Sequence, residues 1–153
     1  MASFIGDYTG KIDAKGRVSL PSALKKQTDG SVVDKFVAKK DIYEPCIILY
    51  TTDEWERQNE LIRAKLNPYN REHNKFLREF YRSAVEITLD SNNRLLIPAR
   101  LLEYAKIEKE VSFSGQDKKI ELWAKELYEQ SETSSEDFAN MATKFLGGDL
   151  NGI

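Results

Sequence analysis

Cysteine and histidine are almost absent from this sequence, which has 153 residues and one residue of each type, Cys46 and His73. A single cysteine cannot form an internal disulfide bond, and this favours a reducing compartment. The ligand spacing of a metal site, a phosphate-binding glycine loop and the turn of a nucleophilic serine are also missing. We therefore expect no metal ion, no cofactor, no small-molecule substrate and no enzymatic activity.

Long apolar runs are missing too, since none approaches the roughly 18 residues that cross a membrane. Residues 1–8 lack the basic region and apolar run of a signal peptide. Hydrophobic residues make up 41% of the chain and charged residues 31%, as in a globular protein. We expect a cytoplasmic protein with no membrane partner, long enough for one ordinary domain or two small ones.

The net charge of −2 would argue against a nucleic-acid partner if the charges were evenly spread. They are not, because residues 11–26 contain five basic residues and one acid, and residues 57–82 contain seven basic residues and three acids. The chain beyond residue 121 is acidic instead. Local patches decide what a surface attracts, so a polyanionic partner stays open.

One motif occurs twice in the chain. Residues 13–21 read DAKGRVSLP, and 77 residues later residues 90–98 read DSNNRLLIP, so both have the form Asp, three residues, Arg, three residues, Pro. A recurrence at this distance predicts two related structural units.

Each motif is expected to be a tight turn between two strands. Gly16 in the first copy corresponds to Asn93 in the second, and these two residue types adopt positive φ most readily. Pro21 and Pro98 then suit the first position of a short helix. The apolar residues on both sides of each turn are typical of strands.

A second correspondence follows at an offset of 73 residues. It matches Ile47, Leu49, Tyr50 and Trp55 to Ile120, Leu122, Trp123 and Tyr128. The loop before these strands is therefore about four residues shorter in the second unit. Further strands are predicted at 35–38, 46–50, 84–89, 94–97, 111–113 and 119–123. Helices are predicted at 22–27, 52–66, 71–81 and 98–105, with a last helix after residue 134.

The paired motifs, with 46–50 leading into 54–56 and with 119–123, resemble the MraZ family over residues 4–129. These are transcriptional regulators of the bacterial division and cell-wall gene cluster. The resemblance implies an α+β fold of two tandem SpoVT-AbrB-like repeats, each a swapped-hairpin, small β-barrel unit, with connecting and C-terminal helices. The expected segments are a first domain 4–56, a helical connector 57–82, a second domain 83–129 and an acidic C-terminal helix and tail 130–153.

The resemblance also implies a function. It predicts a sequence-specific DNA-binding regulator, a repressor that binds short direct repeats in promoter double-stranded DNA. The protein would act as a homo-oligomeric ring in the cytoplasm, associated with the nucleoid. The alternative is an AbrB-like antitoxin or a protein-interaction scaffold without sequence-specific DNA binding, although such antitoxins usually carry one motif.

Arginine presents a planar charged fork that binds phosphate or a guanine edge at two points. Arg17 and Arg94 therefore either contact DNA or pair with the aspartate four residues earlier, and both can hold for one residue. The predicted DNA-binding set is Lys11, Lys15, Arg17, Lys25, Lys26, Arg94 and Arg100. The predicted turn-shaping set is Asp13, Gly16, Asp90 and Asn93.

The two copies are not equally basic. Asn92 stands in the second copy where the first has Lys15, and Thr88 stands where the first has Lys11. We predict that the first copy dominates the affinity. The basic helical connector either extends the DNA surface or packs between protomers, and we favour the second because its aromatic residues need burial.

Overall fold

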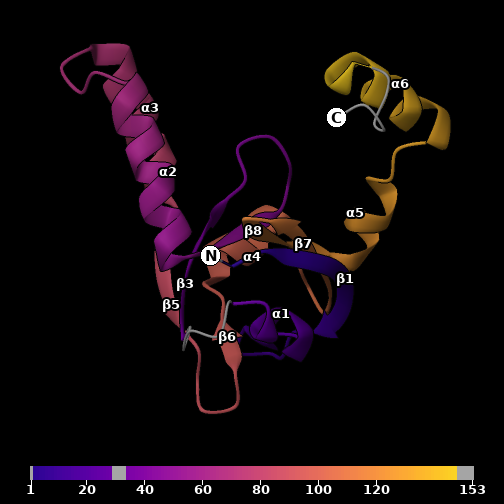
Figure 1. Cartoon of the computed structure of the whole chain (residues 1–153). Helices are drawn as coiled ribbons and strands as arrows, with labels where there is room; N and C mark the ends of the chain where they lie inside the picture. Colours follow the sequence, from indigo (N-terminus) through magenta and orange to yellow (C-terminus); the bar gives the residue numbers. More distant parts are fainter. Residues whose placement is uncertain (1, 29–33, 148–153) are drawn as a thin grey trace.

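The computed structural model describes residues 2–28 and 34–147 and has an α+β fold (Figure 1). Its strands are β1 Phe4–Lys11, β2 Arg17–Ser19, β3 Lys35–Lys40, β4 Ile47–Thr51, β5 Val85–Thr88, β6 Arg94–Leu96, β7 Glu110–Asp117 and β8 Lys119–Ala124. Its helices are α1 Ser22–Lys26, α2 Thr52–Lys65, α3 Arg71–Arg82, α4 Ala99–Ala105, α5 Lys125–Gln130 and α6 Ser135–Leu146. None of these helices is long and apolar enough to cross a membrane.

The longer helices begin at polar side chains that accept hydrogen bonds from backbone amides. Thr51 Oγ1 accepts from the Glu54 amide at the start of α2, Asn70 accepts from two amides of α3, and Ser134 accepts from Asp137 in α6. Such caps satisfy amides that have no partner within the helix. The predicted start of the last helix at Ser134 is confirmed.

The described strands form two antiparallel sheets. One has the order β1-β7-β8-β4-β3-β5, and the other is the short ladder of β2 and β6. Only the β3–β4 and β7–β8 pairs join strands of the same half, whereas β1–β7, β3–β5, β4–β8 and β2–β6 join the two halves. A closed barrel is not found among the described residues, because the larger sheet ends at β1 and β5.

An internal two-fold relation connects the halves. Val18 pairs with its repeat counterpart Leu95 in the β2–β6 ladder, and Ile48 pairs with its counterpart Glu121 between β4 and β8. A residue that pairs with its own repeat equivalent must lie at the symmetry axis. The halves therefore meet as interlocked copies and share one core, to which buried hydrophobic side chains of both halves contribute.

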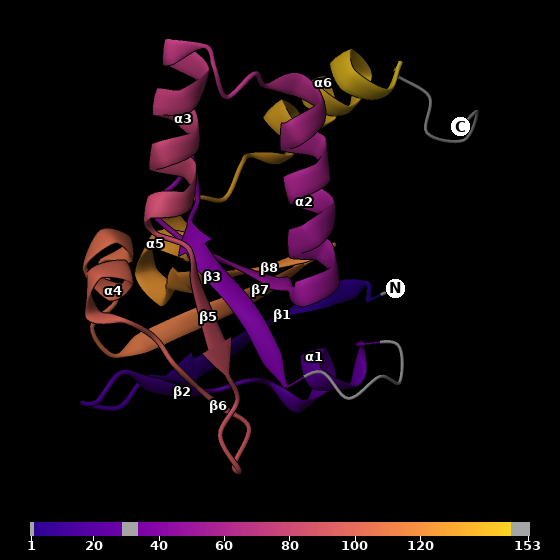
Figure 2. The same cartoon turned by 90° about the vertical axis from the view of Figure 1, so that its left-hand side faces the viewer.

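The helical pair α2–α3 projects from the sheet and is held at its base by aromatic contacts (Figures 1 and 2). Trp55 stacks on Phe80 with ring centroids 5.8 Å apart, and Tyr81 meets Trp55 edge-on at 5.7 Å. Lys39 of β3 lies next to these rings, with its Nζ 4.5 Å from the centroid of the Phe80 ring. Phe76, expected to be buried, keeps 44% of its surface exposed in the single chain.

Candidate nucleic-acid interface

In the first motif turn, one carboxylate organises the whole loop. Asp13 Oδ1 accepts hydrogen bonds from the amides of Lys15 and Arg17, each at 2.9 Å. Asp13 Oδ2 accepts from Arg17 Nε at 2.8 Å. The Asp13 carbonyl also accepts from the Gly16 amide, and the Arg17 carbonyl accepts from the Asp13 amide. The turn is thus fixed before any ligand arrives.

The second turn repeats this geometry with different residues between the ends. Asp90 Oδ1 accepts from the amides of Asn92 at 2.8 Å and Arg94 at 2.9 Å, and Asp90 Oδ2 accepts from Arg94 Nε at 2.8 Å. The pairing of each arginine with its aspartate, one of the two alternatives for these residues, is therefore present in both copies. DNA contact by the same arginines stays a prediction.

These hydrogen bonds change the acidity of both aspartates. The Arg17 amide is the largest cause that lowers the pKa of Asp13 below 3.8, and the Arg94 amide acts in the same way on the pKa of Asp90. A lowered folded-state pKa means that the ionised carboxylate stabilises the folded protein. This contribution is present above the ordinary pKa and is lost as the pH falls through the lowered one.

Replacing both aspartates by asparagine should therefore lower stability in a pH-dependent way. The double variant Asp13→Asn with Asp90→Asn is expected to unfold at lower urea concentration than the wild type near neutral pH. At a strongly acidic pH, below the lowered pKa values of the wild-type aspartates, the gap should shrink. Urea midpoints at the two pH values measure this, and a gap of constant size would contradict the electrostatic explanation.

Each turn also closes against the other half of the chain. The Gly16 carbonyl accepts from the Ile97 amide at 2.8 Å, and the Asn93 carbonyl accepts from the Leu20 amide at 3.0 Å. Gly16 has a φ of +88° and Asn93 a φ of +58°. The positive φ expected at both positions is confirmed.

Gly16→Ala should destabilise the protein by about 1–3 kcal/mol, because its φ is positive and a Cβ there would lie 2.9 Å from the Ile97 carbonyl oxygen. Asn93→Gly is the matched variant, since it puts at the second turn the residue that the first turn has. It should change stability by less than about 1 kcal/mol. Thermal or urea unfolding compares the two, and equal losses would argue against the clash.

The two arginines share the exposed face of the β2–β6 ladder. Arg17 pairs in register with Leu96, and Ser19 pairs with Arg94, while the central pair faces the core. Both arginines donate to their aspartate through Nε. Among the described residues, neither arginine donates a hydrogen bond from its two terminal nitrogens. Each guanidinium therefore keeps its outer edge for another partner.

In Figure 2 both turns lie away from the helical pair α2–α3, the second turn at the bottom of the view and the first turn at the left. Because β2 and β6 are antiparallel, the two turns flank opposite ends of the ladder. Lys15 is exposed within the first turn. Lys11 ends β1 directly opposite Glu110 of β7, and an acid in that place offsets part of its charge. The structure therefore places Lys15, Arg17 and Arg94 around one two-stranded ladder, whereas Lys11 lies opposite an acid of β7.

The remaining predicted basic residues lie on two helices. Lys25 and Lys26 are in the last turn of α1, where Lys25 is half-buried and Lys26 exposed. Arg100 is exposed in α4. A hollow of about 620 Å³ lies between β1 and the start of α1 and is lined in part by Ser19 and Ser22.

Two residues of the exposed ladder face were not predicted from the sequence. Ser19 and Leu96 lie beside the arginines, and Leu96 is 56% exposed. The alternation of the strand was the signal that could have found them, because Arg17 and Ser19 must point to the same side. A hydroxyl in this place adds a donor suited to a phosphate oxygen.

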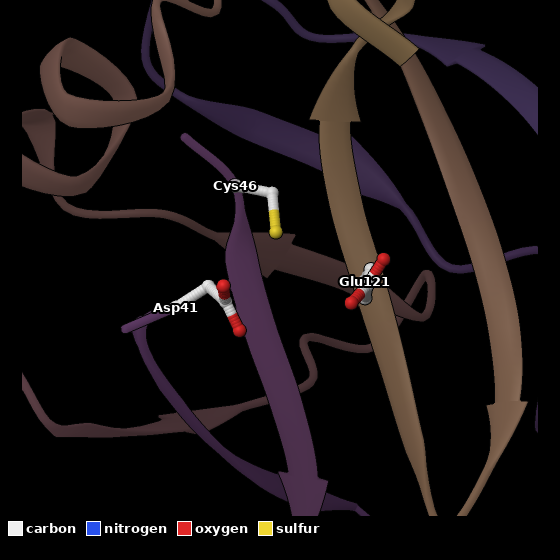
Figure 3. Close-up of side chains that lie close together, drawn as sticks. All are labelled: Asp41, Cys46 and Glu121. Carbon is white, nitrogen blue, oxygen red and sulfur yellow. The ribbon is translucent and has the colours of Figure 1, made fainter. Parts of the chain in front are cut away.

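A separate side-chain cluster lies where β4 meets β8 (Figure 3), with one polar atom each of Asp41, Cys46 and Glu121 within 4.8 Å of one another. Asp41 accepts hydrogen bonds from two loop amides, and Glu121 accepts one from the Trp123 indole. Lys119 Nζ lies 3.5 Å from Glu121 Oε2.

Burial, followed by the two nearby carboxylates, raises the pKa of the Cys46 thiol, which stays protonated at neutral pH. Both carboxylates therefore already have hydrogen-bond or ion-pair partners within the protein, and the thiol is neutral. The absence of a metal stays a prediction from the sequence.

The fold and this surface define a class of protein: two interlocked repeats in one chain, each presenting a braced Asp-x3-Arg turn beside a shared two-stranded ladder. A family model described as "MraZ protein, putative antitoxin-like" matches residues 3–79 and 80–147. The chain belongs to the MraZ family. The two matched segments meet near the end of α3. They do not separate out the predicted connector 57–82, and the predicted domain limits stay a prediction.

Several curated proteins resemble the chain over nearly its whole length. One from Christiangramia forsetii is 41% identical over 97% of this chain and 96% of its own. One from Phocaeicola vulgatus is 38% identical over 97% and 96%, and one from Thermoanaerobacter pseudethanolicus is 39% identical over 82% and 84%. All three are named "Transcriptional regulator MraZ".

Proposed function

We propose that this protein is a transcriptional regulator that binds double-stranded DNA in a sequence-specific way. The observation that carries the proposal is the pair of identically braced turns that flank the β2–β6 ladder, each with an arginine whose terminal nitrogens are left open by its aspartate. The names of its relatives agree with it. We further propose repression of the division and cell-wall gene cluster and a cytoplasmic, nucleoid-associated protein.

The division of labour within each turn follows from its contacts. The aspartate fixes the backbone and holds Nε, so the arginine fork is aimed in advance and loses little side-chain freedom on binding. Phosphate contacts supply affinity, and an arginine that reaches a guanine edge supplies sequence preference. The first turn adds Lys15, where the second has Asn92, so it carries more of the affinity.

A single chain makes few such contacts, which favours assembly. Two turns with three or four basic residues would bind DNA weakly at physiological salt, and several chains on one DNA gain from effective concentration. We therefore propose a homo-oligomeric ring that binds short direct repeats, built from two swapped-hairpin repeats. The strand pairs that join the two halves support the swapped arrangement.

A binding experiment tests the function directly. The chain should retard a duplex that carries its own upstream region, retard a shuffled duplex far less, and leave both uncut with divalent metal present. Log affinity should fall with log salt by about 0.9 for each phosphate contacted. Equal binding to both duplexes would support the scaffold or antitoxin alternative, and cut DNA would overturn the assignment as a non-enzyme.

A further inference from the structure

Helix α6 exposes an apolar stripe that nothing in the described chain covers. Phe138, Met141 and Phe145 follow one another at spacings of three and four residues and are 67%, 43% and 66% exposed. This spacing places them on one face of the helix. Ser134 caps the start and Gly147 ends the helix in a left-handed conformation, so α6 has defined ends. An exposed apolar stripe on a well-bounded helix is typical of a docking element.

Helix α3 offers an uncovered face of the opposite charge. Its inner side packs on Trp55 through Phe80, while a shallow hollow of about 460 Å³ lies along positions 74, 77, 78, 81 and 82. These positions share one side of a helix. Leu77 and Tyr81 give the hollow an apolar floor, and Arg78 and Arg82 stand beside it.

The charges of the two helices are complementary. Residues 131–147 contain three acids and one lysine, and two of the acids lie in the first turn of α6. Helix α3 contains four basic residues and two acids. Arg82 pairs with Glu79, but no ion pair of Arg78 is present among the described residues.

We propose that α6 of one chain docks on the α3 hollow of a second copy of this chain. Figure 1 shows α3 at the upper left and α6 at the upper right, both above the sheet. The link from α5 to α6 is residues 131–134, which span at most about 14 Å when extended. A link this short favours docking on a neighbouring chain over docking on the hollow of the same chain.

This contact joins two different surfaces, so it is head-to-tail. Such a contact repeats from chain to chain and closes into a ring when the rotation allows it. The inference rests on the proposed oligomer and names the elements that hold it together. Both motif turns lie away from α3, so a chain docked on the α3 hollow leaves them accessible.

Variants of the exposed stripe test the contact. Phe138→Ser with Phe145→Ser should reduce the mass in light scattering to that of one chain, with the circular dichroism of the wild type. Affinity for DNA with several repeats should fall by about 10²–10⁴-fold, while affinity for one repeat stays unchanged. Ile42→Ser with Tyr43→Ser is the matched control, since both residues are exposed, and it should keep the wild-type mass.

Cross-linking between different chains tests the partner. A mixture of Phe145→Cys chains and Arg78→Cys chains, treated with a short bismaleimide, should give a cross-linked pair that neither variant gives alone. The native Cys46 is fully buried and should not react. Cross-links in each variant alone, or none in the mixture, would overturn the α6–α3 contact.

Two further outcomes separate this inference from the proposed function. A wild-type oligomer that binds DNA, together with serine variants of unchanged mass, would overturn the α6 contact and leave the function standing. A wild-type chain that is a monomer on and off DNA would overturn both the contact and the proposed ring.

Discussion

Replacing Lys15 and Arg17 together by alanine is expected to weaken DNA binding by about 100-fold at moderate salt. Hydrogen bonds to charged groups contribute about 1.5 kcal/mol or more each, and every 1.4 kcal/mol is a factor of ten. The salt dependence should become shallower by about 0.9 for each phosphate that the variant no longer neutralises. Titration of labelled duplex at several salt concentrations measures both effects.

The second turn provides the matched comparison. Asn92→Ala with Arg94→Ala changes the equivalent positions, which carry one positive charge where the first turn carries two. Its loss of affinity should be smaller. Both variants leave an aspartate without its arginine, so circular dichroism must first show that each is folded. A folded first-turn variant with wild-type affinity would show that these residues do not contact DNA.

Leu95→Ala should lower the free energy of unfolding by about 2–5 kcal/mol, because Leu95 is fully buried at the centre of the β2–β6 ladder. Its neighbour Leu96 is the matched control, since it is the same residue type and 56% exposed. Leu96→Ala should change stability by about 0.5 kcal/mol or less. Urea unfolding followed by circular dichroism gives the free energy of unfolding of the wild type and of both variants. A loss for Leu95→Ala no larger than that for Leu96→Ala would contradict the role of Leu95 in the core.

The same substitution should destabilise both halves, because Leu95 pairs with Val18 across them. The two tryptophans report separately, since Trp55 belongs to the first half and Trp123 to the second. In Trp55→Phe and Trp123→Phe backgrounds, Leu95→Ala should shift both fluorescence transitions to the same urea concentration. Transitions that separate would mean that the halves unfold independently.

Local features were predictable because they depend on residues close in the sequence. The motif turns, the start of α6 at Ser134 and the extent of α3 agree with the predictions, since caps, positive φ and helical spacing act over a few residues. Strand ends were less accurate. The strand predicted at 35–38 continues to Lys40 as β3, and Lys39 is buried within it because an aromatic ring 4.5 Å away covers its charged end.

The sequence by itself determined that the chain has two related units, each with a turn that needs glycine or asparagine and ends in an arginine. Only the tertiary structure decided which strands pair, how Gly16 abuts Ile97, and that each arginine binds aspartate through Nε while its outer nitrogens stay open. The reason is distance along the chain. A turn is decided by its own residues, whereas the register between segments 77 residues apart depends on how the whole core packs.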